Sequence, residues 1–325
     1  MKVLVTGAAG FIGGNLTQTL RDSGIHVQGI DNFSDYYNPS MKAERVLQSN
    51  LSGVITKIDI CDRTNLESMF RKFNPTHVVH LAAQGGVRAS KSNPQPYLNS
   101  NQIGFLNVLQ LAEEFNVEKF IYASSSSVYG DDLQAPFKES DSLNPPKSLY
   151  ALSKLSNELI AKYLPTHNTQ RIGLRFFTVY GPWGRPDMAV FRLLSSSLLG
   201  DSFKLTANLE VKRDFTFVDD VSRVVQELID SRERLEGSQI FNVAGGKPTS
   251  LSELLTIMKS LGISVRYETY PQDDLDLKLT HGSTDKLGSK GFSIPDTTLS
   301  LGISKTWTWL RSQDQHSIRE WLEYK

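Results

Sequence analysis

The stretch Lys2-Val3-Leu4-Val5-Thr6-Gly7-Ala8-Ala9-Gly10-Phe11-Ile12-Gly13 decides the fold of this chain. Its aliphatic residues predict a strand over 2–6, and apolar residues at helical spacing predict a helix from Phe11 onward. Gly7 and Gly10 let the backbone turn tightly and approach a pyrophosphate, and Gly13 lets the helix pack closely on the strand. The helix N-terminus adds unpaired N–H donors and partial positive charge. We therefore predict a phosphate site that includes Phe11 and Ile12, although an ordinary strand-to-helix turn would show the same glycines.

A carboxylate at the end of the second predicted strand strengthens this interpretation. Asp31 lies eighteen residues after Gly13, where a carboxylate accepts hydrogen bonds from the hydroxyls of an adenosine ribose. The same negative charge would repel a 2′-phosphate. The sequence therefore predicts NAD rather than NADP as the cofactor.

The rest of the first half alternates short β-branched runs with segments of helical period, which is typical of a parallel sheet covered by helices. The predicted strands are 2–6, 26–30, 54–58, 77–81, 119–123 and 171–176. Two later segments, 215–218 and 239–243, could add strands or ribbons to this sheet or its rim. We expect an α/β fold, a doubly wound parallel sheet of Rossmann-like type with a smaller C-terminal substrate-binding domain. The expected boundaries are 1–180 for the NAD-binding domain, with 215–245 contributing discontinuously, and 181–214 with 246–325 for the second domain.

Composition narrows the class of protein. Thirty-five basic residues balance thirty-five acidic ones among 325, so no overall field would attract nucleic acid or an anionic membrane. The apolar run before Gly7 is too short for a signal peptide, no window reaches the length of a membrane span, and the single Cys61 fits a reducing compartment. We expect a cytoplasmic protein without nucleic-acid or membrane partners. The acidic residues 273, 274 and 276 lack a histidine or further carboxylate nearby, so we expect a solvated loop and no metal site.

Tyr150 and Lys154 are the candidate chemical groups. They stand four residues apart at the start of a predicted helix, so both side chains share one face. A phenol with a pKa of about 10 is a poor base at neutral pH. An ammonium about 4 Å away, at an effective dielectric of ~20, would favour the phenolate by about 4 kcal/mol and lower that pKa. A surface helix would show the same pair, but 124–130 precedes it by about twenty residues and follows a strand, which places both segments at the carboxyl edge of the sheet.

The series formed by 7–13, His80-Leu81-Ala82-Ala83, Asn101-Gln102-Ile103-Gly104, 124–130 and 150–154 resembles the motifs of extended short-chain dehydrogenase/reductases. The resemblance implies that Ser125, Tyr150 and Lys154 work together. Ser125 would hydrogen-bond a sugar hydroxyl, Tyr150 would take and return its proton, and Lys154 would also hold the nicotinamide ribose. The further positions that it implies at the cofactor are Asn32, Asp59, Ile60, Leu81, Ala82, Ala83, Asn101 and Phe177, with Asp59 and Ile60 beside the adenine and Asn101 supporting the site.

Two segments point to one branch of this family. Ser126 and Ser127 stand where sugar-nucleotide 4,6-dehydratases place Asp-Glu and where UDP-glucuronate decarboxylases carry a Glu. Residues 173–189 closely resemble UDP-glucuronate 4-epimerases, whose product is UDP-galacturonate. By this resemblance Ser126, Ser127 and Thr178 would bind the substrate carboxylate.

Four further positions are implied at the charged parts of the substrate. Arg88 and Arg185 would lie near the pyrophosphate or the uronate, and Arg213 near the phosphates. A structural ion pair would explain each arginine as well. Segment 270–275 departs from the arginine or glutamine followed by Pro-Gly-Asp of many relatives, so Asp274 is a weak candidate for phosphate or ribose contact.

The predicted function is NAD-dependent epimerisation at C4 of a UDP-sugar, UDP-glucuronate to UDP-galacturonate, through a 4-keto intermediate. The alternatives are an epimerase of a neutral UDP-hexose or UDP-N-acetylhexosamine, a UDP-glucuronate decarboxylase, and a catalytically silent NAD-binding sensor or scaffold. The resemblance also implies a homodimer joined through helices near 101–115 and 150–164, although apolar faces on these helices would also fit simple burial.

Overall fold

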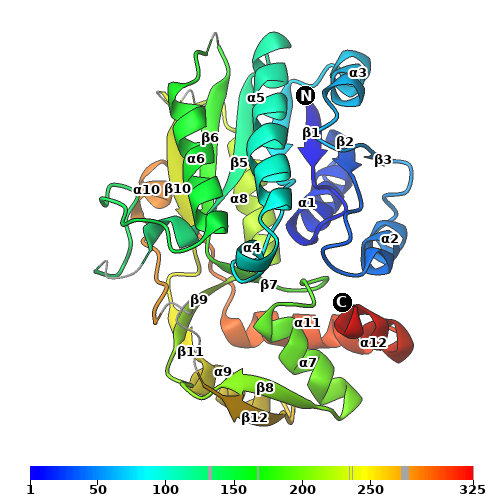
Figure 1. The fold of residues 1–325 in the computed structure, drawn as a ribbon, viewed down its shortest axis with the longest axis vertical. Coiled ribbons are helices and arrows are strands. Elements are labelled where there is room, and N and C mark those ends of the chain that lie inside the picture. Colours follow the sequence, from blue (N-terminus) through cyan, green and yellow to red (C-terminus); the bar gives the residue numbers. More distant parts are fainter. Residues whose placement is uncertain (131–133, 167, 234, 236, 272–277, 325) are drawn as a thin grey trace.

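Seven parallel strands form the main sheet of the molecule (Figure 1). In their order across the sheet they are β10 (Gln239–Val243), β6 (Gln170–Phe176), β5 (Lys119–Ser125), β4 (His77–His80), β1 (Lys2–Thr6), β2 (His26–Asp31) and β3 (Ile55–Lys57). All seven residues of β6 and all four of β4 are buried, as a strand covered on both faces requires. The order reverses between β1 and β4, which is the position where ligands bind in sheets of this kind. The doubly wound fold predicted from the sequence is confirmed.

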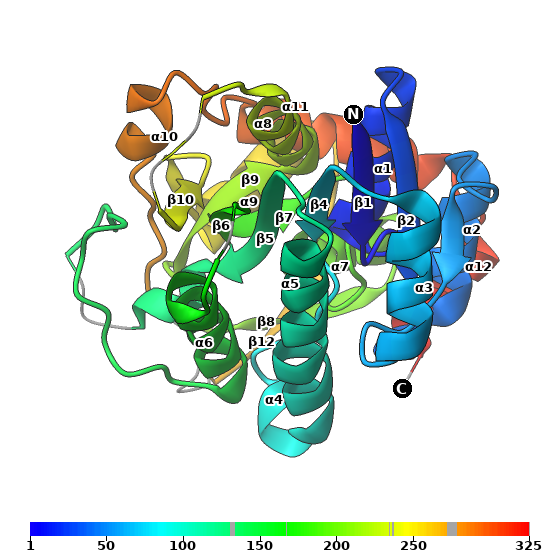
Figure 2. The same cartoon turned by 90° about the horizontal axis from the view of Figure 1, so that it is seen from above.

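Helices cover both faces of this sheet (Figure 2). One face carries α3 (Arg63–Phe73), α5 (Phe105–Glu114) and α6 (Leu149–Tyr163), and the other carries α1 (Phe11–Asp22) and α8 (Val218–Asp230). On the first face Phe70, Phe105 and Phe120 belong to one apolar core. A second core, which includes Val5, Leu16 and Val224, lies on the other face and continues into the C-terminal part of the chain.

The two small sheets of the molecule lie beyond the carboxyl ends of the main strands. They are β11-β9-β7 and β12-β8 (Figure 1). Their strands are β7 (Thr178–Tyr180), β8 (Ser202–Thr206), β9 (Lys212–Phe217), β11 (Pro248–Ser250) and β12 (Arg266–Tyr270). The other elements are α2 (Pro39–Gln48), α4 (Ala89–Ser92), the π-helix η1 (Tyr97–Gly104), the 3-10 helix η2 (Ser126–Tyr129), α7 (Ala189–Leu199), α9 (Leu251–Ser260), α10 (Asp285–Ser289), α11 (Leu299–Arg311) and α12 (Gln315–Glu323).

The two late segments, 215–218 and 239–243, belong to different sheets. Residues 239–243 form β10 and extend the main sheet beside β6. Residues 215–217 belong to β9, which pairs with β7 and β11 in a separate sheet, and Val218 already begins α8. The extended Phe217 at the N-cap, followed by Asp219 and Asp220 in the first turn, favours a helix start at this point because acidic groups stabilise a helix N-terminus.

This computed structural model describes residues 1–130, 134–166, 168–233, 235, 237–271 and 278–324. Of the predicted site residues, Asp274 lies outside the described ranges, as do the neighbouring acidic residues 273 and 276. Within those ranges no helix combines the length and the apolar character that crossing a bilayer requires.

Candidate active site

One cavity of about 1410 Å³ opens at the carboxyl ends of the main strands. It collects most of the positions that the sequence singled out. The predicted residues that line it are Gly7, Gly10, Phe11, Ile12, Gly13, Asp31, Asn32, Ile60, Leu81, Ala82, Ala83, Arg88, Ser125, Ser126, Ser127, Tyr150, Lys154, Phe177, Thr178, Arg185 and Arg213. Asp59 and Asn101 are not among the lining residues, and both support residues that are.

The turn between β1 and α1 has the shape that its glycines predicted. Gly7 has a φ of +71°, and a Cβ there would lie 2.7 Å from the backbone nitrogen of Ala82. A Cβ on Gly13 would lie 2.0 Å from the carbonyl oxygen of Gly7. Side chains would therefore fill the space over the turn and push α1 away. The cradle that results, with the N-terminus of α1 at its floor, fits the phosphates of a dinucleotide.

Asp31 is held in place at the end of β2. Its carboxylate accepts the backbone N–H groups of Ala9 at 3.1 Å and Phe33 at 2.7 Å, and Lys42 Nζ lies 3.6 Å away. The next residue, Asn32, donates to the carboxylate of Asp59 at 3.0 Å. Asp59 thus orients a cavity residue from behind, and its place beside the adenine stays a prediction.

Asn101 joins two walls of the cavity. It accepts the N–H of Gln84 at 2.7 Å and donates to Gln84 O at 3.1 Å and to Ser153 Oγ at 2.9 Å. The loop after β4 is therefore fastened to α6, which carries Tyr150 and Lys154. Asn101 is 1% exposed and holds these two walls together, and its role at the cofactor stays a prediction.

The serines that follow β5 form a compact turn. Ser125 Oγ accepts hydrogen bonds from the N–H of Ser127 at 3.2 Å and from Ser127 Oγ at 2.9 Å. Behind the turn, Ser124 donates to Glu158, which also pairs with Arg175 through two bonds of 2.9 and 2.8 Å. Because Glu158 shares a face of α6 with Tyr150 and Lys154, this buried network sets the helix against the serine turn.

The environment of Tyr150 contradicts one expectation. Lys154 Nζ lies 6.0 Å from the centre of the Tyr150 ring and donates to the carbonyl of Ala123 at 2.9 Å. Burial raises the pKa of Tyr150, and a hydrogen bond with Ser125 and the charge of Arg185 offset only part of this effect. The expected lowering by an adjacent ammonium was wrong for the chain alone, because desolvation of the buried phenol is the larger effect and the Lys154 ammonium donates to the carbonyl of Ala123 instead. Burial also lowers the pKa of Lys154, to about 8.

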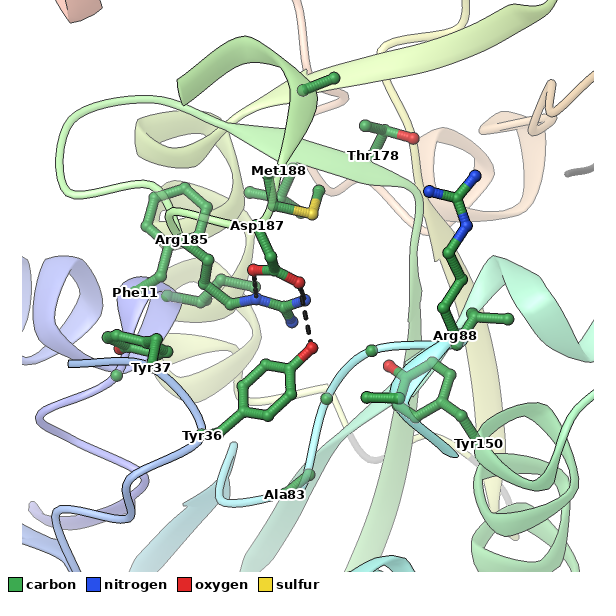
Figure 3. Close-up of a pocket in the computed structure, with 18 of the residues that line it drawn as sticks. Phe11, Tyr36, Tyr37, Ala83, Arg88, Tyr150, Thr178, Arg185, Asp187 and Met188 are labelled. Carbon is green, nitrogen blue, oxygen red and sulfur yellow. Dashed lines mark hydrogen bonds and ion pairs between the residues drawn. The ribbon is translucent and has the colours of Figure 1, made fainter. Parts of the chain in front are cut away.

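Figure 3 shows how ten of the lining residues, which it labels, lie around the cavity. Arg88, Thr178 and Tyr150 stand on one side, and Phe11 and Tyr37 stand on the other. Elsewhere in the lining, Arg213 donates to the carbonyl of Lys212 at 3.0 Å, and Phe177 is 5% exposed.

Arg185 lies between these two sides and is paired. Its Nε and Nη2 donate to Asp187 at 2.9 and 2.6 Å, and Tyr36 donates to the same carboxylate at 3.1 Å (Figure 3). Tyr36 and Asp187 were not predicted as site residues. The spacing of two residues between Arg185 and Asp187 was the only signal, and nothing in the sequence connects Tyr36 to them.

The comparisons with known proteins agree with this geometry. A model of the NAD dependent epimerase/dehydratase family matches residues 3–244. UDP-glucuronate 4-epimerase 3 of Arabidopsis thaliana is 38% identical over 328 residues, covering 95% of this chain and 76% of the plant protein. The UDP-glucuronic acid 4-epimerase of Bacillus cereus, solved with UDP-glucuronic acid and NAD, is similar with a TM-score of 0.86 and 31% identity, covering 96% of this chain and 99% of that one. The UDP-glucose 4-epimerase of Thermus thermophilus, solved with NAD, has a TM-score of 0.84 and 29% identity, covering 97% of this chain and 100% of that one.

Proposed function

The chain belongs to the NAD-dependent epimerase/dehydratase family, and from this premise we propose that it interconverts UDP-glucuronate and UDP-galacturonate by epimerisation at C4. The cofactor is NAD. One observation supports C4 epimerisation of a uronate as the reaction. Ser125, Tyr150 and Lys154 line the same cavity as Ser126, Ser127 and Thr178. A proton-transfer group and a set of hydroxyls suited to a carboxylate therefore meet at one place.

The chain's own residues would bind the cofactor and move one proton. The turn over 7–13 and Asp31 would hold the two phosphates and the adenosine ribose. A bound NAD would supply a reversible hydride acceptor at C4, which epimerisation through a 4-keto sugar requires. Ser125 would orient the C4 hydroxyl, and Tyr150 would take its proton and give it back. Lys154, already fixed by the carbonyl of Ala123, would hold the nicotinamide ribose.

Ser126, Ser127 and Thr178 would protect the intermediate. A 4-keto sugar with a carboxylate on C5 is a β-keto acid, which loses carbon dioxide when the breaking bond stands perpendicular to the carbonyl plane. Hydroxyls that hold the carboxylate away from this alignment would suppress the loss. This role explains why serines serve here in place of the acids that assist elimination.

The decisive experiment needs no added reductant. We expect purified protein loaded with NAD to convert UDP-glucuronate into UDP-galacturonate, with products separated by chromatography. We expect Tyr150→Phe to bind both ligands and to lose turnover by ~10²- to 10⁴-fold, the usual contribution of a positioned acid–base group. A parent enzyme that binds NAD yet leaves every UDP-sugar unchanged would favour the silent sensor or scaffold instead.

Epimerisation of a neutral UDP-hexose is the second candidate. Asp187 neutralises Arg185, which lowers the positive charge available to a uronate. The UDP-glucose 4-epimerase of Thermus thermophilus is also similar over nearly the whole chain. Turnover of UDP-glucose and UDP-N-acetylglucosamine, measured beside UDP-glucuronate, separates the two: a higher kcat/KM on either neutral sugar would assign the enzyme to it.

A further inference from the structure

Three loops that are distant in sequence meet around the guanidinium of Arg185. Asp187 belongs to the same loop, after β7, and binds Nε and Nη2 in a two-pronged pair. Tyr36 comes from the loop after β2, and its ring lies under the guanidinium, 5.5 Å from Cζ. Gly85 comes from the loop after β4. All four residues line the cavity.

Gly85 fixes how closely the guanidinium approaches the loop after β4. A Cβ on Gly85 would lie 2.4 Å from Arg185 Nη1, closer than real Cβ atoms come to other atoms. The φ of Gly85 is outside the left-handed region, so alanine would fit the backbone and only the arginine would have to move. Tyr97 donates to the carbonyl of Gly85 at 2.5 Å and so holds the loop that supports the guanidinium.

The pairing leaves one edge of Arg185 for a ligand. Asp187 occupies Nε and Nη2, and within the described ranges no residue accepts a hydrogen bond from Nη1. The Arg185 side chain is 25% exposed, inside a cavity that also holds Tyr150 and Thr178. Burial alone would raise the pKa of Asp187, but Arg185 and the Tyr36 hydrogen bond lower it, so the carboxylate that orients the guanidinium stays ionised.

We propose that Gly85, Tyr36 and Asp187 are positioning residues that form a seat for Arg185 and aim its Nη1 edge at an oxyanion of the nucleotide sugar. This inference rests on the proposed function and extends it, because it assigns the substrate's anionic group to an arginine whose position three loops determine. Arginine suits the task because its charge is permanent and its donors are rigid. The oxyanion is either the uronate carboxylate or the diphosphate.

Gly85→Ala is the sharpest test because it moves the guanidinium without changing any charge. Asp187→Asn would also remove a negative charge, which by itself would raise the affinity for an anion and obscure the loss of orientation. We expect Gly85→Ala to weaken nucleotide-sugar binding roughly tenfold, the value of one charge-assisted hydrogen bond, and Tyr36→Phe to weaken it by a smaller factor. The matched control is Gly53→Ala, since a Cβ there meets nothing within 4 Å, and its affinity should equal the parent's.

A double-mutant cycle shows whether Gly85 acts through Arg185. Calorimetric titrations of NAD-loaded protein in a Tyr150→Phe background, which halts turnover, would compare Gly85→Ala, Arg185→Gln and both together. The inference predicts that Gly85→Ala costs almost no affinity once Arg185 is glutamine. Equal losses in both backgrounds, or no loss in the parent, would overturn it, since a methyl that blocked the sugar directly would act without the arginine.

Titrations with UDP-glucuronate, UDP-glucose and UDP distinguish the uronate carboxylate from the diphosphate. Together with the activity assay, they also distinguish a failure of the proposed function from a failure of the seat for Arg185. A loss seen with UDP-glucuronate but not with UDP-glucose or UDP assigns the seat to the uronate, and an equal loss with all three assigns it to the diphosphate. If the unsubstituted enzyme does not epimerise UDP-glucuronate while the cycle still shows coupling, the proposed function fails and the seat stands. If it does epimerise UDP-glucuronate and the cycle is additive, the seat fails and the proposed function stands.

Discussion

At the scale of single residues, the role of Ser127 and Thr178 in suppressing decarboxylation can be tested by measuring a by-product. Both line the cavity beside Ser125, and we assign them to the substrate carboxylate. Ser127→Ala combined with Thr178→Ala should release the carboxylate into the alignment that favours loss of carbon dioxide. We expect a larger fraction of UDP-pentose among the products of UDP-glucuronate, measured by chromatography. A by-product fraction equal to the parent's would remove this role from the two hydroxyls.

How far the sequence predicted the site depends on how local each residue's surroundings are. The spacing of Tyr150 and Lys154 predicted that they share one face of a helix, and the resemblance to extended short-chain dehydrogenase/reductases added Ser125; the structure places all three in the lining of one cavity. The proton affinity of Tyr150 could not be predicted, because it depends on burial and on where the Lys154 ammonium points, and that ammonium binds the carbonyl of Ala123. The partners of Arg185 lie in loops that are far apart in sequence. Only the folded structure shows that these loops come together.

At the scale of elements, Asp214 joins three segments that sequence patterns treat separately. It lies in β9, is fully buried, and accepts the backbone N–H groups of Gly246 and Gly282, each at 3.0 Å. Burial raises its pKa from 3.8 to about 6, although these N–H groups and the charge of His281 oppose the shift. The folded state therefore binds a proton more tightly than the unfolded chain between these two values.

The stability of the protein should follow from this shift with a definite sign. The contribution of protonated Asp214 is fully present below pH 3.8 and is lost as pH rises through about 6, by up to about 3 kcal/mol. We expect Asp214→Asn, which cannot titrate, to lack this term. Urea unfolding of both proteins from pH 4 to 7 measures it: the free energy of unfolding of the parent should fall relative to that of the variant, and a constant difference would contradict the assignment.

Element types were predicted well where the hydrophobic period was clear. The six early strands lie where expected, with ends that moved by up to two residues, for example β5, which runs on to Ser125. The division of the late strands was harder to predict, since 215–217 and 239–243 are both short segments with β-branched or aromatic residues and yet enter different sheets. The helix between them, α8, packs on α1 and separates the two segments.

At the scale of the whole molecule, the expected homodimer is still a prediction. Large apolar side chains stand exposed on η1 and α6, which lie against each other: Leu98 at 44%, Ile103 at 54%, Leu152 at 51%, Leu159 at 47% and Tyr163 at 71%. We expect twice the monomer mass by light scattering, and monomers after Ile103→Glu with Leu159→Glu. Leu47→Glu, on α2 and 68% exposed, is the control that should stay dimeric. A monomeric parent would show that these faces do not hold two copies together.

The place of β10 has a consequence for how the protein can be divided. This strand arrives from 239–243 and covers the outer side of β6, all of whose residues are buried. A polypeptide ending near residue 180 would keep every glycine and acid–base group of the first half, but it would present the unpaired backbone of β6 to other molecules. Bare strands of that kind recruit one another into aggregates. The edge of the sheet beside β6 is therefore covered only once the chain extends to residue 243.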